Sequence, residues 1–274
     1  MRTQTKAKAA QGHSPRIPAP TAVEVAQEIA SCLRQMGDPV RARGAQHYFK
    51  EAIVALGITA PALRGFVSDR VKALRPGPKA REAITLCDRL LREPEIEIRA
   101  AGILLLGAFK RALTPNLLKP AERWLEHRLD NWALVDCFCS SVLSPLLERY
   151  PDVETTVTSW SHAESLWLRR AALVTFIPFA RQGRRLDTAY RLAQAHFHDP
   201  EDLMHKATGW LMREAGKTDM QRLRRFLLQH GPAIPRTALR YAIERFSAPE
   251  RAHLLQATHA PRKGTERSHD AGNH

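Results

Sequence analysis

The sequence predicts an all-α fold, arranged as an α-solenoid of helix pairs with a concave basic groove. Apolar residues recur at three- and four-residue spacing through most of the chain, as on the buried faces of helices. The period-two alternation and β-branched clusters of strands are scarce. A nearly constant interval of one helix pair also separates a set of related dipeptides, which is typical of helical repeats.

Short turns separate the predicted helices. Pro and Gly stop a helix, and Asp or Ser can cap the next one. In chain order, the turn signals are GDP at 37–39, RPGP at 75–78, REP at 92–94, TP at 114–115, HDPED at 198–202 and GPAIP at 231–235. Helices of about ten to fifteen residues fit between such turns. Ser161 and Glu164 have the spacing of a capping box and predict the start of a long inner helix.

The repeated dipeptides pair a polar, mostly basic, residue with a small one. Their first residues are separated by 35, 37, 34 and 36 positions, and they are Arg64, Arg99, Asp136, Arg170 and Lys206. If each repeat presents its second helix in the same way, these residues form a row along the concave surface. The small neighbours would allow close helix packing. The alternative is chance, since Arg-Ala pairs are common in a chain rich in both residues.

The charge of the chain favours a polyanionic partner. Its 274 residues include 42 Lys and Arg against 28 Asp and Glu, which gives a net charge of +14. Nucleic acid is the expected partner, and an anionic membrane surface is the competing one. No apolar stretch is long enough to span a membrane, and no secretory signal is evident, so we expect a cytoplasmic protein of bacterial type that is nucleoid-associated when on DNA. We also expect a monomer. Four cysteines without a CxxC pair indicate reduced thiols.

Three regions are expected along the chain. Residues 1–20 carry four basic residues, three prolines and no acid, and predict a flexible basic arm. Residues 21–255 form the predicted repeat domain, and residues 256–274 a disordered tail.

The segment NWALVDCFCS at 131–140 places an acid inside an apolar run. Trp132 and Asp136 are four residues apart and share one helix face. A carboxylate in a cationic row weakens phosphate binding, so chemistry explains Asp136 better than affinity does. Further along the chain, Lys206, Trp210 and Arg213 form a second stripe. Two indole walls beside an acid suit a cationic ligand. The alternative is that both tryptophans are core residues, as we expect for Trp124, Trp160 and Trp167.

The chain resembles the AlkD family of DNA alkylation repair glycosylases, which are built from HEAT-like repeats. The segments that carry the resemblance are HYFKEAIVALGITAPALR at 47–64, NWALVDCFCSSVLSPLLERYP at 131–151, SLWLRRAAL at 165–173 and ATGWLMREAGKT at 207–218. Departures from the family pattern occur at Asn131, Ala133 and Ala60. They affect the expected substrate range and one expected phosphate contact.

The resemblance implies site residues one position at a time. It implies Asp136 as the catalytic aspartate, Trp132 and Trp210 as active-site tryptophans, and Arg170 as the supporting arginine. The resemblance and the repeat row together give the expected DNA contacts, which are Tyr48, Arg64, Arg99, Lys206 and Arg213.

The resemblance also implies an activity, namely the release of positively charged alkylated purines from double-stranded DNA by a monofunctional glycosylase. Asp136 would stabilise the oxocarbenium-like sugar, and Arg170 would hold a phosphate and keep Asp136 ionised. We expect no cofactor and no metal, and interpret His196 and His198 in HFHD as a solvated helix end. The alternatives are a noncatalytic paralogue that binds branched or damaged DNA, and a HEAT-type protein scaffold.

Overall fold

The computed structural model describes residues 21–74 and 78–259. The predicted arm at 1–20, residues 75–77 of the predicted turn at 75–78, and residues 260–274 of the predicted tail lie outside the described residues.

The described chain is all-α, as predicted. Its first helices are α1 (Ala22–Gln35), α2 (Pro39–Ala45), α3 (Ala60–Ala73), α4 (Ala80–Leu90) and α5 (Ile96–Ala108). The middle of the chain forms α6 (Leu118–His127), α7 (Trp132–Phe138), α8 (Ser144–Arg149), α9 (Val153–Ser159), α10 (Leu166–Val174) and α11 (Ile177–Ala180). The last helices are α12 (Leu186–Ala195), α13 (Asp202–Gly216), α14 (Met220–His230), α15 (Arg236–Ala242) and α16 (Ala248–Ala257).

Several short helical segments connect the longer helices. The 3-10 helices are η1 (Gln46–Tyr48), η2 (Lys110–Ala112), η3 (Pro115–Leu117), η5 (Trp160–His162) and η6 (Gly231–Ala233), and η4 (Cys139–Leu143) is π-helical. Within 21–74 and 78–259, β pairing is limited to an isolated bridge between Val54 and Glu95. No helix in this part of the chain is long and apolar enough to cross a membrane.

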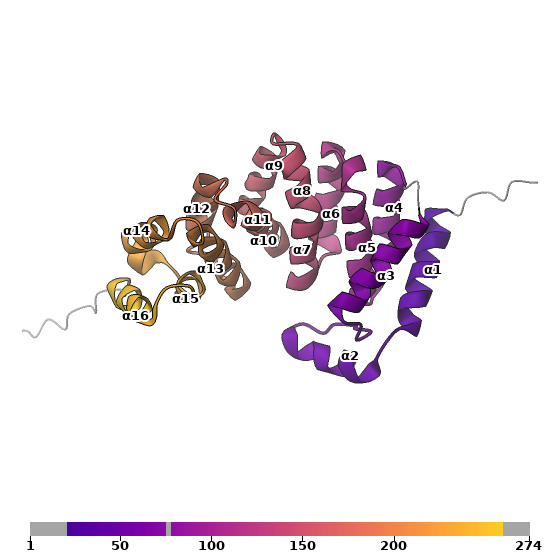
Figure 1. The fold of residues 1–274 in the computed structure, drawn as a ribbon, viewed down its shortest axis with the longest axis horizontal. Coiled ribbons are helices and arrows are strands. Elements are labelled where there is room, and N and C mark those ends of the chain that lie inside the picture. The colour runs from indigo at the N-terminus through magenta and orange to yellow at the C-terminus, as the bar shows by residue number, and fades with distance from the viewer. Residues whose placement is uncertain (1–20, 75–77, 260–274) are drawn as a thin grey trace, which may run out of the picture.

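The helices form a curved solenoid (Figure 1). One row consists of α3, α5, α7, α10, α13 and α15, each in contact with the next. Helices α4, α6, α12 and α14 pack behind this row against α5, α10 and α13. In Figure 1, α7 and α10 lie near the middle, while the two end groups, α1–α3 and α13–α16, bend toward the same side. The row therefore brings residues from distant repeats onto one face.

The repeat register predicted from the dipeptides is confirmed by the helix bounds. Residues 64, 99, 136, 170 and 206 fall on α3, α5, α7, α10 and α13, each at the fourth or fifth position of its helix. The expected role of the small neighbours holds in part. Ala171 and Ala207 are buried at helix contacts. Gly65 is different, because a side chain there would meet nothing within 4 Å, so the prediction of close packing at Gly65 was wrong.

Side-chain caps explain where several helices begin. Thr21 and Glu24 form a capping box at α1, and the Asp38 carboxylate accepts hydrogen bonds from the Val40 and Arg41 N–H groups at α2. The predicted capping box of Ser161 and Glu164 was wrong. Ser161 lies in η5, and α10 begins after Ser165 without a side-chain cap. Ser161, which the spacing placed at the helix start, belongs instead to the 3-10 turn that precedes α10.

A buried glutamate fixes the segment that leads into α3. The Glu97 carboxylate accepts hydrogen bonds from the N–H groups of Leu56 and Gly57, both at 2.8 Å, and from that of Ile58 at 3.2 Å. Gly57 adopts a φ of +78°, and a side chain there would lie 2.3 Å from the Asp38 carbonyl oxygen. Only glycine fits this turn. The loop that carries residues 48–51 is thereby anchored at its C-terminal side.

Two hydrophobic cores run through the solenoid. The first lies among α1, α3, α4 and α5, and the second extends from α4 to α16, with α4 and α5 contributing to both. At the C-terminal end, α16 continues to Ala257 and Thr258 is 2 % exposed. The packed body therefore extends beyond the boundary predicted at residue 255.

Candidate active site

Asp136 lies on α7 one turn after Trp132, as the spacing predicted. The side chain of Asn131 caps this helix by accepting a hydrogen bond from the Leu134 N–H at 3.1 Å. Trp132 and Asp136 both line a cavity of about 400 Å³ on the inner row. Val135 and Phe138, on the other side of α7, are fully buried in the core. Core packing therefore holds the face of α7 that carries the acid toward the cavity.

A π-helical turn, η4, directly follows α7 and begins three residues after Asp136. Pro145 cannot donate to the Ser141 carbonyl, and its ring would clash there in a regular α-helix, so the wider turn of η4 relieves the conflict. The displaced Ser141 carbonyl packs so closely on α5 that a side chain at Gly107 would lie 2.7 Å from its oxygen. Ser140 donates to the Asp136 carbonyl at 2.8 Å. The backbone behind the acid is thus tightly held.

Arg170 on α10 forms a bidentate ion pair with Asp136. Its Nε donates to Oδ1 at 2.8 Å and its Nη2 to Oδ2 at 2.8 Å. Its Nη1 donates to the Leu203 carbonyl at 2.6 Å. The Arg170 side chain is only 5 % exposed and that of Asp136 16 %. Each guanidinium nitrogen therefore binds the acid or α13, and Arg170 also lines the cavity. The expected phosphate contact of Arg170 stays a prediction.

The pKa of Asp136 is raised above the ordinary range of an aspartate. Burial causes the rise, and the hydrogen bonds and positive charge of Arg170 oppose it without cancelling it. Arg170 thus favours the ionised form of Asp136, as expected, but burial has the larger effect and the net pKa is raised. The remaining exposed fraction of Asp136 faces the cavity, where the carboxylate can act on a bound group.

Aromatic rings line the same cavity as the acid. Trp132 stacks on Phe49 with ring centroids 5.4 Å apart and an interplanar angle of 19°. Its Nε1 donates to the Tyr48 carbonyl at 3.4 Å, so the loop after η1 orients the indole. Trp210 on α13 and Tyr241 on α15 line the same cavity and are partly exposed there.

The cavity combines cations with these aromatic walls. It is lined by Tyr48, Lys50, Glu51, Trp132, Asp136, Arg170, Leu203, Lys206, Trp210, Arg213 and Tyr241. These residues come from η1 and the loop after it, and from α7, α10, α13 and α15, so the cavity spans both bent ends of the solenoid and its centre. Such a site suits a ligand with both anionic and cationic parts.

Comparisons with known proteins agree with this architecture. Residues 29–246 match a family model described as DNA alkylation repair enzyme. The chain belongs to the DNA alkylation repair enzyme family. A solved structure described as a predicted DNA alkylation repair enzyme from Enterococcus faecalis is similar, with a TM-score of 0.69 and 18 % identity over 77 % of this chain and 97 % of that chain. At that identity the likeness concerns the fold. The search of curated proteins gave no significant match.

Membership of the DNA alkylation repair family implies DNA as the partner, and several expected contact residues lie at the cavity. Tyr48 is 76 % exposed at its edge. Lys206 lines the wall and pairs with Asp202 at 2.8 Å. Arg213 pairs with Glu244 and approaches Glu214. Arg64 does not line the cavity, but it is exposed on α3, and its charge acts on Cys137 beside the acid.

Arg99 does not share this environment. Its guanidinium pairs with Asp130 at 3.0 and 3.2 Å, and its side chain is 10 % exposed. It lines a separate cavity of about 280 Å³ between α5 and the loops before α5 and α7. The prediction that Arg99 faces the groove as a free cation was therefore wrong. Its repeat position is as predicted, but its side chain binds Asp130, which directly precedes the N-cap residue of α7.

Some residues of the site were missed in the sequence. Phe49, Lys50 and Glu51 lie in a loop whose position depends on distant contacts. Tyr241 could have been found, because the repeat row continues by 34 positions from Lys206 to Arg240, at the fifth position of α15, and Tyr241 follows it.

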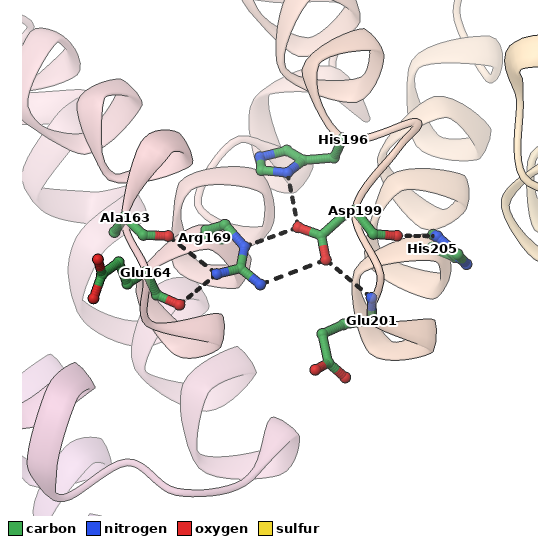
Figure 2. Close-up of polar contacts among 7 residues, drawn as sticks. All are labelled: Ala163, Glu164, Arg169, His196, Asp199, Glu201 and His205. Carbon is green, nitrogen blue, oxygen red and sulfur yellow. Dashed lines mark hydrogen bonds and ion pairs between the residues drawn. The ribbon is translucent and has the colours of Figure 1, made fainter.

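The histidines of HFHD differ in environment. His196 is 3 % exposed and contacts the Asp199 carboxylate through Nδ1 at 3.3 Å (Figure 2), whereas His198 is exposed. The expectation of a solvated turn was thus wrong for His196. Within the described residues, no group of three or more His, Cys, Asp or Glu side chains could hold a metal ion.

Proposed function

We propose that this protein is a monofunctional DNA glycosylase that hydrolyses the N-glycosidic bond of positively charged alkylated purines, such as 3-alkyladenine and 7-alkylguanine, in double-stranded DNA. The observation that carries the proposal is the Asp136 carboxylate, held by Arg170 in a cavity that Trp132, Trp210 and several cations also line. The product is an abasic site.

The chemistry requires little beyond a positioned carboxylate. An alkylated purine with a formal positive charge leaves as a neutral base, because the electrons of the broken C1′–N bond neutralise the ring. It needs no general acid to protonate it. Positive charge then develops on the deoxyribose. A fixed carboxylate close to this charge stabilises the transition state in a low-dielectric site.

Asp136 supplies that carboxylate. Its oxygen atoms are oriented by Arg170, so the acid does not have to reorganise during the reaction. A water molecule then forms the new C1′–O bond and loses a proton, which Asp136 accepts in the mechanism that we propose. Electrons and atoms balance without a cofactor.

The aromatic walls favour the cationic state. An indole face attracts positive charge, and this attraction strengthens when water is excluded. Trp132 is held by Phe49, which leaves its remaining surface for the cavity, and Trp210 faces the same cavity from α13. Both rings can contact the sugar or base as charge moves from one to the other.

The cationic rim would hold the DNA backbone. Lys50, Lys206 and Arg213 line the cavity, and Arg64 is exposed on a neighbouring helix. Lys206 and Arg213 also pair with acids of this chain, so phosphate binding must compete with those pairs. We further propose that the enzyme acts as a monomer.

The test is base release from defined duplexes. Oligonucleotides with a single 7-methylguanine, or with the neutral lesion hypoxanthine as a matched control, are incubated with excess protein, and free base is measured by chromatography. We expect release of 7-methylguanine without metal, in the presence of EDTA, and no release of hypoxanthine. Salt-sensitive DNA binding without release of any base would favour a noncatalytic paralogue instead. Absence of DNA binding would favour a protein scaffold.

A further inference from the structure

A second arginine, next to Arg170 on α10, anchors a separate buried cluster (Figure 2). The Nε of Arg169 donates to the Asp199 carboxylate at 2.8 Å, and its Nη2 does so at 3.5 Å. Its Nη1 donates to the carbonyls of Ala163 at 3.0 Å and Glu164 at 2.5 Å. Arg169 therefore joins the loop before α10 to the loop between α12 and α13.

Asp199 is the centre of this cluster. Its side chain is 4 % exposed, as is that of His196, which contacts it. It also accepts a hydrogen bond from the Glu201 N–H at 3.0 Å. Burial by itself would raise the pKa of Asp199, but the hydrogen bonds from Arg169 and Glu201, together with the charge of Arg169, lower it below its ordinary value. The lowered pKa favours the ionised form of Asp199, which forms a buried ion pair with Arg169.

The cluster holds the first turn of α13. Glu201 is the residue that caps this helix, and its N–H is bound by Asp199. The Asp199 carbonyl contacts Nε2 of His205, one turn into α13, at 2.6 Å (Figure 2). Asp199 therefore contacts both the capping residue and the first turn of the helix, and through Arg169 it ties that helix to α10.

The first turn of α13 is also a wall of the candidate active site. The Leu203 carbonyl accepts a hydrogen bond from Nη1 of Arg170 at 2.6 Å. Leu203, Lys206 and Trp210, all on α13, line the cavity. The separation of α10 and α13 thus determines whether Arg170 can bind Leu203 and Asp136 at the same time.

We propose that Arg169 and Asp199 are positioning residues for the active site: they hold α13 against α10, so that Arg170 orients Asp136 and Trp210 faces it. Neither residue lines the cavity. Their role in catalysis rests on the function proposed above, whereas their effect on the geometry of Asp136 does not. Loosening the cluster weakens the hold of Arg170 on the acid without removing any cavity side chain.

A matched control exists elsewhere in the solenoid. Arg184 binds Glu148 through two hydrogen bonds of 2.9 Å, and so also links one repeat to the next. This pair is about half exposed and lines a different cavity, with Pro145 and Phe179. A change at Arg184 removes an inter-repeat arginine–carboxylate pair without touching α13.

The experiment compares Arg169→Lys and Asp199→Asn with Arg184→Lys in the full chain. Lysine keeps the charge of Arg169 but cannot reach two carbonyls and a carboxylate together. Protein labelled with ¹³C at aspartate carboxyls is titrated by NMR, and the Asp136 signal is assigned with Asp136→Asn. We expect the midpoint of Asp136 to move to higher pH in both cluster variants, because Arg170 opposes the effect of burial less well, and to stay unchanged in Arg184→Lys.

Single-turnover release of 7-methylguanine is the second measurement. We expect the rate to fall by up to about 100-fold in the cluster variants, as for misplaced catalytic groups, with unchanged DNA affinity. If the wild type releases no base, the proposed function fails, and the titration still decides the positioning role. An unchanged Asp136 midpoint in either folded cluster variant overturns the inference. Loss of folding in both, seen by circular dichroism, also overturns it, because the cluster is then only a stability element.

Discussion

Arg170 and Asp136, which are 34 positions apart in the sequence, form a bidentate pair with both N–O distances at 2.8 Å. The third contact of the guanidinium is the Leu203 carbonyl at 2.6 Å. An arginine whose three nitrogens are all bound in this way orients its partner. The pair therefore fixes the position of the acid at the centre of the cavity-lining row.

The pH dependence of base release should report the environment of Asp136. The reaction requires the carboxylate, and burial raises the pKa of Asp136 above the ordinary aspartate range. Acidification therefore protonates Asp136 at a higher pH than it would an exposed aspartate, and the acid limb of the single-turnover rate should lie correspondingly high. Release without enzyme is subtracted at each pH, and circular dichroism verifies folding. A rate that stays constant down to the ordinary aspartate range would contradict this assignment.

Replacement of Trp132 should slow the chemical step more than it weakens DNA binding. A desolvated cation–π contact contributes about 1–2 kcal/mol, so Trp132→Leu should reduce the single-turnover rate roughly tenfold. Trp167→Leu is the matched control, since Trp167 is a partly buried tryptophan that packs on the core and does not line the cavity. Equal rate losses in the two variants, at equal folded fractions, would argue against a direct role for Trp132.

Arg64 and Arg99 should behave differently although they occupy the same repeat position. Arg64 is exposed, so Arg64→Ala should make the negative slope of log K against log salt shallower, by about 0.9 for each phosphate that the variant no longer neutralises. Arg99 is engaged with Asp130, so Arg99→Ala should leave the slope unchanged and lower the free energy of unfolding instead. Fluorescence anisotropy on a duplex and urea unfolding measure the two quantities. The opposite pattern would restore Arg99 to the residues that bind DNA.

Gly209 should be required for the packing of α15 on α13. A side chain there would lie 2.5 Å from both the Ala238 carbonyl oxygen and Cβ of Tyr241, so Gly209→Ala should cost about 1–3 kcal/mol of unfolding free energy. Gly65→Ala is the control, because nothing lies within 4 Å of that position, and alanine in a helix should stabilise by about 0.5–1 kcal/mol. Equal urea midpoints for the two variants would show that α15 is free to move away.

The sequence predicts the repeat register well, because each helix pair has a similar length. A polar residue at the same helix position therefore recurs at a nearly constant interval. It also predicts that Trp132 and Asp136 share a face, which needs only one helix. Contacts between repeats are harder to predict. The turn of Arg99 toward Asp130 and the stacking of Phe49 on Trp132 depend on loops whose paths are set by distant residues such as Glu97. The pairing of Arg169 with Asp199 depends on the spacing of two helices.

The most direct test of the central claim is single-turnover release of 7-methylguanine by the wild type and by Asp136→Asn, with DNA affinity measured on the same duplex. Asparagine keeps the shape of Asp136 and removes its charge. We predict a rate loss of about 100- to 1000-fold, the scale for losing one electrostatic stabiliser of a transition state, with DNA affinity retained. Full base release by Asp136→Asn would contradict the account.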